Sequence, residues 1–269
     1  MPRVAVPHGA LDYQIIDLTP PWMRPRGTIV MHHGLGSTVG IWAGWLPALI
    51  AGYRVVTFDM RGHGASARPD GETKLTLDML TDDLFAVMDA AGAGRVHLVG
   101  ESIGGTIALN AVLRAPDRFA SLTVSNGAHV GATIQSVQNW RGLLAGGDAT
   151  DWSLHMMGQR FHQGALGQEA WDWYHAQQSA CDPAVLIGGM EALVGADLRP
   201  RLSALDLPVL LLHPDNSPFI PVPLMADFRD RVAGARLHVI GHARHGLPFS
   251  HATDCAALLA RFLAEIDDA

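Results

Sequence analysis

The sequence has little of what marks nucleic-acid-binding, membrane or secreted proteins. Its 269 residues carry 19 Lys and Arg against 26 Asp and Glu, a net charge of −7 with no basic run, which argues against nucleic acid or a membrane surface as a partner. No apolar stretch approaches the roughly 18 residues of a membrane span, and the N-terminus has no apolar signal segment. The only two cysteines, Cys181 and Cys255, fit no metal or redox spacing. We therefore expect free thiols and a cytoplasmic protein.

The chain has instead an alternating pattern of strands and helices. Short apolar, β-branched runs are separated by helical patterns, which predicts an α/β fold with a mostly parallel, doubly wound sheet. Residues 3–18 predict an antiparallel hairpin that turns at His8 and Gly9. The remaining predicted strands are residues 28–34, 54–60, 95–100, 121–126, 207–213 and 236–241, and the predicted helices are residues 42–51, 77–91, 103–114 and 253–266.

Residues 133–198 interrupt this pattern. They hold no convincing strand but are rich in tryptophan and methionine, at Trp140, Trp152, Met156, Met157, Trp171, Trp173 and Met190. Such a stripe is more often helix core than ligand contact. A helical insertion between two strands lies above the edge of the sheet, however, so core and pocket lining can be the same residues. We predict a core of residues 1–132 and 199–269 with a helical insertion of residues 133–198.

A serine lies where a predicted strand leads directly into a predicted helix. Residues 100–105 read GESIGG, and an elbow of one residue forces Ser102 into a strained backbone conformation. Gly100 and Gly104 remove the side chains that would collide with the neighbouring strand and helix. The turn lifts the Ser102 hydroxyl out of the sheet and directs the N-terminus of the next helix at it. The motif alone is weak, but its context predicts a nucleophile rather than an idle serine.

A serine nucleophile needs a base, which is expected in the loop after the last strand. That region offers His242, His245 and His251. His245 is the best placed, because His242 follows too closely on the strand and His251 heads the final helix. Together with His238 these histidines straddle a strand and a loop, which is a poor arrangement for metal ligands. We therefore expect no metal and no cofactor.

Acyl transfer also needs donors for an oxyanion. Residues 32–36, HHGLG, follow a strand and open a glycine loop, so the backbone N–H of Leu35 can face the serine. The N–H of Ile103, the first residue of the helix after the elbow, supplies a second donor.

These segments together resemble the α/β-hydrolase family. HHGLG corresponds to the oxyanion loop, FDMRGHGAS (58–66) to the D-x-R-G-x-G-x-S loop, GESIGG to the nucleophile elbow, and HARHG (242–246) to the histidine loop. Within the family, TFDMRGHGAS, SNGAHVG and GADLRPRLSALDLPVLLL are similar to the 3-oxoadipate enol-lactone hydrolase group. The resemblance implies the α/β-hydrolase fold, with residues 133–198 as a helical cap.

The sequence departs from the family at the catalytic acid. Members usually carry it after the seventh strand as G-x-x-D-x-x-x-P, but here the segment reads LLLHPDNSPFIP, with Ser217 in the aspartate position. The alternative position, after the sixth strand, holds Ser125 and Asn126. Asp215 is the only carboxylate near either position, so the resemblance assigns it to orient His245 and stabilise the imidazolium. The other interpretation of Asp215 is a turn-forming aspartate.

The expected function is hydrolysis of a small ester or lactone through an acyl-enzyme formed on Ser102. If the substrate carries the carboxylate of an enol-lactone, a cation must face the pocket, and Arg141 and Arg160 are candidates. The full set of candidate substrate-binding residues is Trp42, Trp140, Arg141, Met157, Arg160, Phe161 and Phe219.

Three alternatives stay open: a carbon–carbon bond hydrolase of a diketone, a cofactor-free ring-cleaving dioxygenase, and a non-catalytic ligand-binding protein. In each case the partner is a small molecule. The sequence does not set the oligomeric state and leaves a homodimer open.

Overall fold

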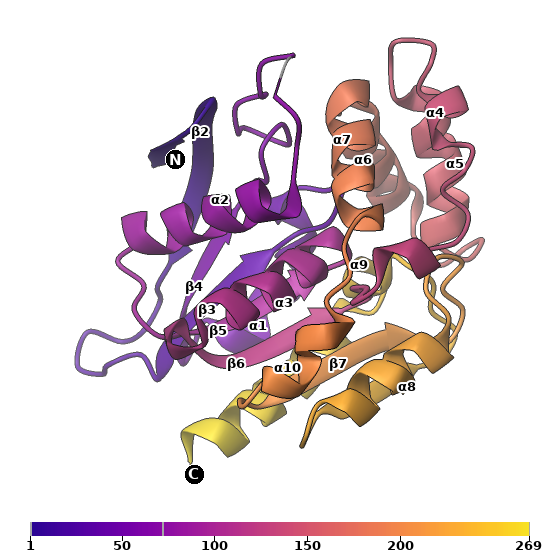
Figure 1. Cartoon of the computed structure of the whole chain (residues 1–269). Coiled ribbons are helices and arrows are strands. Elements are labelled where there is room, and N and C mark those ends of the chain that lie inside the picture. Colours follow the sequence, from indigo (N-terminus) through magenta and orange to yellow (C-terminus); the bar gives the residue numbers. More distant parts are fainter. Residues whose placement is uncertain (1, 72, 269) are drawn as a thin grey trace.

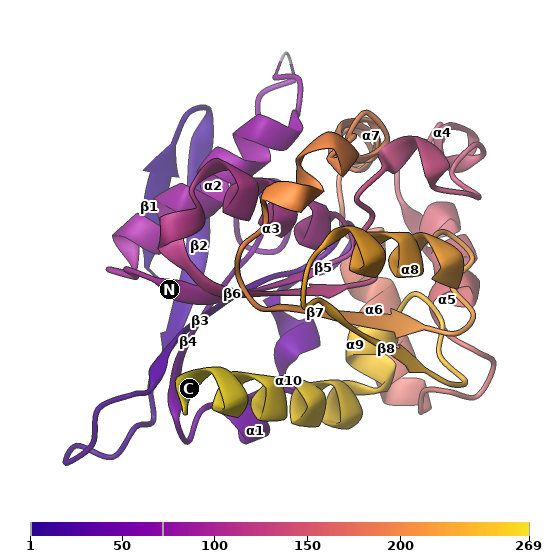
Figure 2. The ribbon, with the colours of Figure 1, turned by 60° about the horizontal axis from the view of Figure 1, so that its bottom comes forward.

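A single eight-stranded sheet forms the centre of the molecule. The computed structural model describes residues 2–71 and 73–268, and the strand order is β1-β2-β4-β3-β5-β6-β7-β8 (Figures 1 and 2). All strands from β3 to β8 are parallel, which confirms the predicted doubly wound sheet. The strands are β1 (Arg3–Val6), β2 (Gly9–Ile16), β3 (Gly27–His32), β4 (Tyr53–Phe58), β5 (Val96–Glu101), β6 (Phe119–Ser125), β7 (Val209–Pro214) and β8 (Arg236–Ile240).

The predicted N-terminal hairpin is confirmed. β1 pairs antiparallel with β2, with Val6 opposite Gly9, and β2 continues antiparallel along β4. His8 takes a φ of 64°, a left-handed conformation that few non-glycine residues adopt and that tight hairpin turns require.

Helices cover both faces of the sheet. Figure 2 shows α1 and α10 on one face and α2, α3 and α8 on the other. Outside the insertion, the helices are α1 (Leu46–Leu49), α2 (Leu77–Ala90), α3 (Ile103–Arg114), α8 (Val222–Arg231), α9 (Leu247–Ser250) and α10 (Ala252–Asp267), with short 3₁₀ segments at η1 (Val39–Trp42), η2 (Pro116–Arg118) and η4 (Arg199–Ala204).

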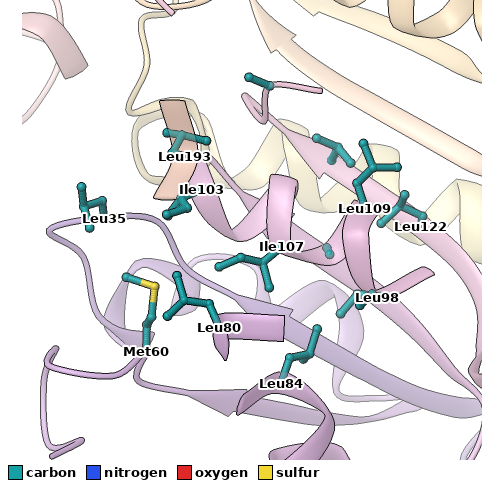
Figure 3. Packing of buried hydrophobic residues seen from close by; sticks show 14 of the residues in the cluster. Leu35, Met60, Leu80, Leu84, Leu98, Ile103, Ile107, Leu109, Leu122 and Leu193 are labelled. Carbon is teal, nitrogen blue, oxygen red and sulfur yellow. The ribbon is translucent and has the colours of Figure 1, made fainter. Parts of the chain in front are cut away.

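The inner strands β3 to β7 are largely apolar on both faces because both of their faces are covered. Along β3, Val30 packs into one hydrophobic cluster, while its neighbours Ile29 and Met31 pack into the other. β7 repeats this alternation, with Leu211 in the first cluster and Leu210 in the second. The two-residue period of a strand thus divides a continuous apolar run between two cores. Figure 3 shows part of the first cluster, around α2, α3 and β5.

The predicted helix over residues 42–51 is wrong as a single element. The chain forms η1 and then the single turn α1, joined through bonds such as Trp45 N–H to the Trp42 carbonyl. Gly44 lies in this joint, and a Cβ there would come within 2.6 Å of Ala252. Close packing against α10 therefore shapes this segment, together with Pro47, which cannot donate a helical hydrogen bond.

The segment between β6 and β7 is helical, as the sequence predicted. It contains η3 (Gly131–Thr133), α4 (Trp140–Leu143), α5 (Thr150–Arg160), α6 (Gln168–Ser179) and α7 (Pro183–Val194), which gather beside the N-terminal end of α3 (Figure 1). Trp140 and Trp152 meet edge to face with ring centroids 5.3 Å apart and belong to the first hydrophobic cluster. Tryptophan in this segment therefore does form core.

Cys181 and Cys255 are buried free thiols. No helix among the described residues combines the length and the hydropathy that crossing a membrane demands.

Candidate active site

Ser102 lies at the sharp turn between β5 and α3. Its φ of 55° and ψ of −124° are the strained values that the elbow demands. A Cβ on Gly100 would come within 2.3 Å of the Gly104 carbonyl oxygen, and one on Gly104 within 2.5 Å of the His32 carbonyl oxygen. Glycine is thus required on both sides of the serine, because strand and helix leave no room for a side chain.

His245 meets the serine from the loop after β8. Its Nε2 is 3.0 Å from the Ser102 hydroxyl oxygen, and the Asn126 side chain holds the loop by donating to the His245 carbonyl at 2.7 Å. Burial lowers the pKa of His245 well below its ordinary value, and the charge of Arg160 lowers it further. The imidazole is therefore neutral at neutral pH, the form that can accept the serine proton.

The other histidines of this loop stay apart from the serine. His242 is exposed at a φ of 57°, and His251 occupies the N-cap position of α10 without a capping bond from its side chain. Among the described residues, no three His, Cys, Asp or Glu side chains are grouped as metal ligands would be.

Asp215 does not contact His245, so its assigned role as the partner of the histidine needs correction. Its carboxylate is exposed and accepts backbone N–H bonds from His242 at 3.0 Å and Ala243 at 3.1 Å. The His245 Nδ1 has no hydrogen-bond partner among the described residues. The Ser217 hydroxyl accepts the N–H of Ile220 at 3.2 Å, as a turn residue does. Asp215 thus binds the backbone of the histidine loop, and within residues 2–71 and 73–268 no carboxylate hydrogen-bonds to His245.

Two buried histidines, whose roles the sequence did not reveal, hold the oxyanion loop. His33 donates through Nδ1 to the Gly34 carbonyl at 2.8 Å, while its Nε2 accepts the Met60 N–H at 2.8 Å. The His63 Nε2 accepts the Gly36 N–H at 3.0 Å. Burial lowers the pKa of His63 to about 4, so it stays neutral and can accept. Both residues lie inside the recognised motifs, and only their partners identify what they do.

The two expected oxyanion donors are free to bind a ligand. Within residues 2–71 and 73–268, neither the Leu35 N–H nor the Ile103 N–H donates to another protein group. Ile103 opens α3, where the first N–H groups of a helix have no partner inside the helix. Both residues are buried, so an oxyanion bound there would be shielded from water.

One cavity joins the serine, the histidine and the insertion. Its polar lining is Ser102, Asn126, Arg160 and His245. The rest of the lining is apolar and comes from the oxyanion loop, the loops after β6 and β7, and α4, α5 and α7: Leu35, Ala128, Ile134, Val137, Trp140, Met156, Met190, Leu193, Val194, Phe219 and Ile220. The Phe219 ring stands edge to face against His245, with centroids 4.7 Å apart.

Of the seven candidate substrate-binding residues, the cavity includes Trp140, Arg160 and Phe219. The other four candidates do not line the cavity. Trp42, Met157 and Phe161 pack in the second hydrophobic cluster instead. Arg141 lies on the surface and pairs with Glu191.

Glu101 is a further buried group that the sequence reasoning passed over. It directly precedes Ser102, is 1% exposed, and lies with Oε1 3.8 Å from the Arg160 guanidinium. Burial raises its pKa to about 7, although the charge of Arg160 opposes this. Its position inside the GESIGG motif was visible, but its burial and its partner follow only from the tertiary structure.

Comparisons with known proteins identify the family. Residues 27–252 match the model of the alpha/beta hydrolase fold family, and the chain belongs to that family. It is 30% identical over 255 residues to 2-hydroxymuconate semialdehyde hydrolase from Pseudomonas sp. (strain CF600), covering 90% of this chain and 88% of the relative. The crystal structure of the enol-lactonase from Burkholderia xenovorans LB400 matches with a TM-score of 0.88 and 25% identity, covering 98% of this chain and 100% of the other. The family resemblance and the similarity to enol-lactonases are thus confirmed.

Proposed function

We propose that this protein is a serine hydrolase of a small ester or lactone whose acyl group is uncharged and apolar. The observation that carries the proposal is the 3.0 Å approach of the His245 Nε2 to the Ser102 hydroxyl, at one wall of a largely apolar cavity. A strained serine, a neutral buried imidazole and two free N–H groups are the parts that acyl transfer needs.

The reaction takes place in two stages. In the first, the Ser102 oxygen bonds to the substrate carbonyl carbon while His245 takes the hydroxyl proton, and the Leu35 and Ile103 N–H groups bind the oxyanion. The carbonyl then re-forms, the bond to the leaving oxygen breaks, and His245 returns the proton to that oxygen. In the second stage, water attacks the acyl-enzyme, His245 takes a proton from the water, and Ser102 leaves with that proton as the acid is released.

The lining of the cavity favours an uncharged acyl group. Arg160 is the one Lys or Arg among the lining residues. All three of its guanidinium nitrogens already donate to protein groups, namely Gln178 at 3.0 Å, Tyr174 at 3.2 Å and the Leu35 carbonyl at 2.6 Å. A buried substrate carboxylate could use only the second N–H of Nη1 and of Nη2, which already donate to Tyr174 and Leu35, and an incompletely paired buried charge is costly. The alternative of an apolar pocket therefore has the stronger support.

The cavity is also narrow, because side chains of α4, α5 and α7 crowd it. Short or slender acyl chains are expected to fit without rearrangement of the helices above. Bulky side chains such as Trp140 and Met190 limit the space.

The test is a series of p-nitrophenyl esters from acetate to octanoate, with matched neutral and carboxylate-bearing lactones, assayed on the wild type and on Ser102→Ala. The proposal expects kcat/KM to be highest for short neutral acyl groups and to require Ser102. It also expects a fluorophosphonate probe to label the wild type but not the variant. Ester turnover that survives in Ser102→Ala, or a wild type that neither turns over nor becomes labelled, would contradict it.

A second candidate is hydrolysis of a carbon–carbon bond in a diketone. The 30% identity to a 2-hydroxymuconate semialdehyde hydrolase favours it, and the same serine and histidine could perform it. Release of a carboxylic acid from a vinylogous diketone at a higher kcat/KM than from any ester would establish this candidate. An oxygen electrode tests the dioxygenase alternative in the same assay, since hydrolysis consumes no oxygen.

A further inference from the structure

Arg160 connects the helical insertion to two loops of the active site at once. It ends α5 and is 1% exposed. Its Nη2 donates to the Leu35 carbonyl in the oxyanion loop at 2.6 Å, and its own carbonyl accepts the N–H of Gly246 in the histidine loop at 2.8 Å. Gly246 has no room for a side chain there, because a Cβ would come within 2.2 Å of Phe161. Arg160 thus contacts the carbonyl of Leu35, the residue whose N–H is an expected oxyanion donor, and the N–H of Gly246, the residue after His245.

The bond to the Leu35 carbonyl completes the fixing of the oxyanion loop. The Leu35 carbonyl and the Gly36 N–H belong to the same peptide unit, which Arg160 holds at the oxygen and His63 holds at the nitrogen. The preceding peptide unit is held at the Gly34 carbonyl by His33 and by the Ser37 N–H. Its nitrogen is the Leu35 N–H, which stays free. A peptide plane bound at both ends cannot rotate without losing two buried hydrogen bonds.

The charge of Arg160 is balanced inside the protein rather than by solvent. Its Nη1 lies 3.8 Å from Glu101 Oε1 and donates to the Tyr174 hydroxyl at 3.2 Å, and its Nε donates to Gln178. Glu101 in turn presses on the oxyanion loop from the strand side, since a Cβ on Gly34 would come within 2.0 Å of its Oε2. The planar guanidinium suits this arrangement because its donors point in fixed directions in one plane.

We propose that Arg160 is a positioning residue that holds the oxyanion loop and the histidine loop in register, and that it does not bind a substrate carboxylate. The inference rests on the proposed function, since an aligned Leu35 N–H matters for rate only if an oxyanion forms. Loss of the Arg160 side chain should therefore lower kcat equally for charged and uncharged substrates.

The experiment compares Arg160→Met, Arg160→Lys and Arg141→Met on two esters that differ only in a terminal carboxylate. Arg141→Met is the matched control, because it removes a surface arginine from the same insertion. We expect Arg160→Met to lower kcat by about 10- to 100-fold on both esters, with KM changed less than about threefold. Arg160→Lys should recover part of the rate through its one remaining donor group, and Arg141→Met should match the wild type. A loss confined to the acidic ester, or a change in KM alone, would overturn the proposal.

A second measurement separates this inference from the proposed function. Hydrogen–deuterium exchange of peptides that cover residues 33–38 measures how strongly the backbone N–H groups of the oxyanion loop are protected, and it needs no turnover. We expect faster exchange in Arg160→Met than in the wild type and Arg141→Met, and equal exchange in all three would refute the role of Arg160. If the wild type hydrolyses neither ester, the proposed function fails while the exchange result still decides the role of Arg160. Should Arg160→Met not fold, the kcat and exchange of Arg160→Lys carry the same test.

Discussion

The substitution Asp215→Asn distinguishes two kinds of active site. The carboxylate accepts two backbone N–H bonds, from His242 and Ala243, one on each oxygen. An asparagine keeps one acceptor oxygen and turns an NH₂ group toward the other N–H, so one bond is lost. A hydrogen bond to a charged group contributes about 1.5–3 kcal/mol, and solvent at this exposed carboxylate reduces that to about 1 kcal/mol. Even if the whole loss falls on the ordered histidine loop, kcat/KM decreases at most about fivefold.

An aspartate that pairs with the catalytic histidine behaves differently, because its replacement by asparagine costs about 10⁴-fold in kcat. The assay is kcat/KM for a neutral aryl ester together with the thermal midpoint, on Asp215→Asn and on Asp206→Asn as an exposed aspartate outside the site. A decrease of 10³-fold or more at unchanged fold would show that Asp215 reaches His245 in the working protein. The inference that His245 works without a carboxylate partner would then be refuted.

The remaining predictions concern the same pair and the buried histidines. Ser102→Ala and His245→Ala should each lower kcat by about 10³-fold or more, and the double variant should be little worse than either. His242→Ala should change kcat little. Steady-state kinetics check this, and a large loss in His242→Ala with none in His245→Ala would mean that the wrong base was assigned. The acid limb of kcat/KM should lie below pH 6.5, because burial lowers the pKa of His245 and only the neutral form accepts a proton; a limb above pH 7 would contradict the burial argument. The free energy of unfolding should decrease as the pH falls from about 6.5 toward 4, because the unfolded chain takes up protons there that buried His32, His63 and His213, with pKa values lowered to about 4, do not. Glu101 opposes this trend, and urea titrations at several pH values would show which effect prevails.

Local patterns were sufficient for most of the fold and for the contact between Ser102 and His245. Every strand predicted from an apolar run is present, and for the inner strands β3 to β7 the reason is that a strand covered on both faces is apolar on both. The elbow was readable because the G-x-S-x-G spacing is local: a Cβ on Gly100 would meet the Gly104 carbonyl, although the clash at Gly104 is with His32 of the neighbouring strand. His245 could be selected because a loop after the last strand can reach the serine only at certain distances along the chain. The helix over residues 42–51 failed because its packing partner is α10, some 200 residues further along.

The sequence by itself determined the sheet, the elbow and the Ser–His pair, since each depends on neighbours in the chain or on the order of strands. The tertiary structure alone decided what the charged and bulky side chains do. Asp215 satisfies backbone N–H groups of a loop that lies beside it only after folding. Arg160 donates to Leu35 in the oxyanion loop and to Tyr174 and Gln178 in α6, two segments far from each other in the sequence. A long side chain can reach many partners, so its partner is fixed by packing in space and not by its place in a motif.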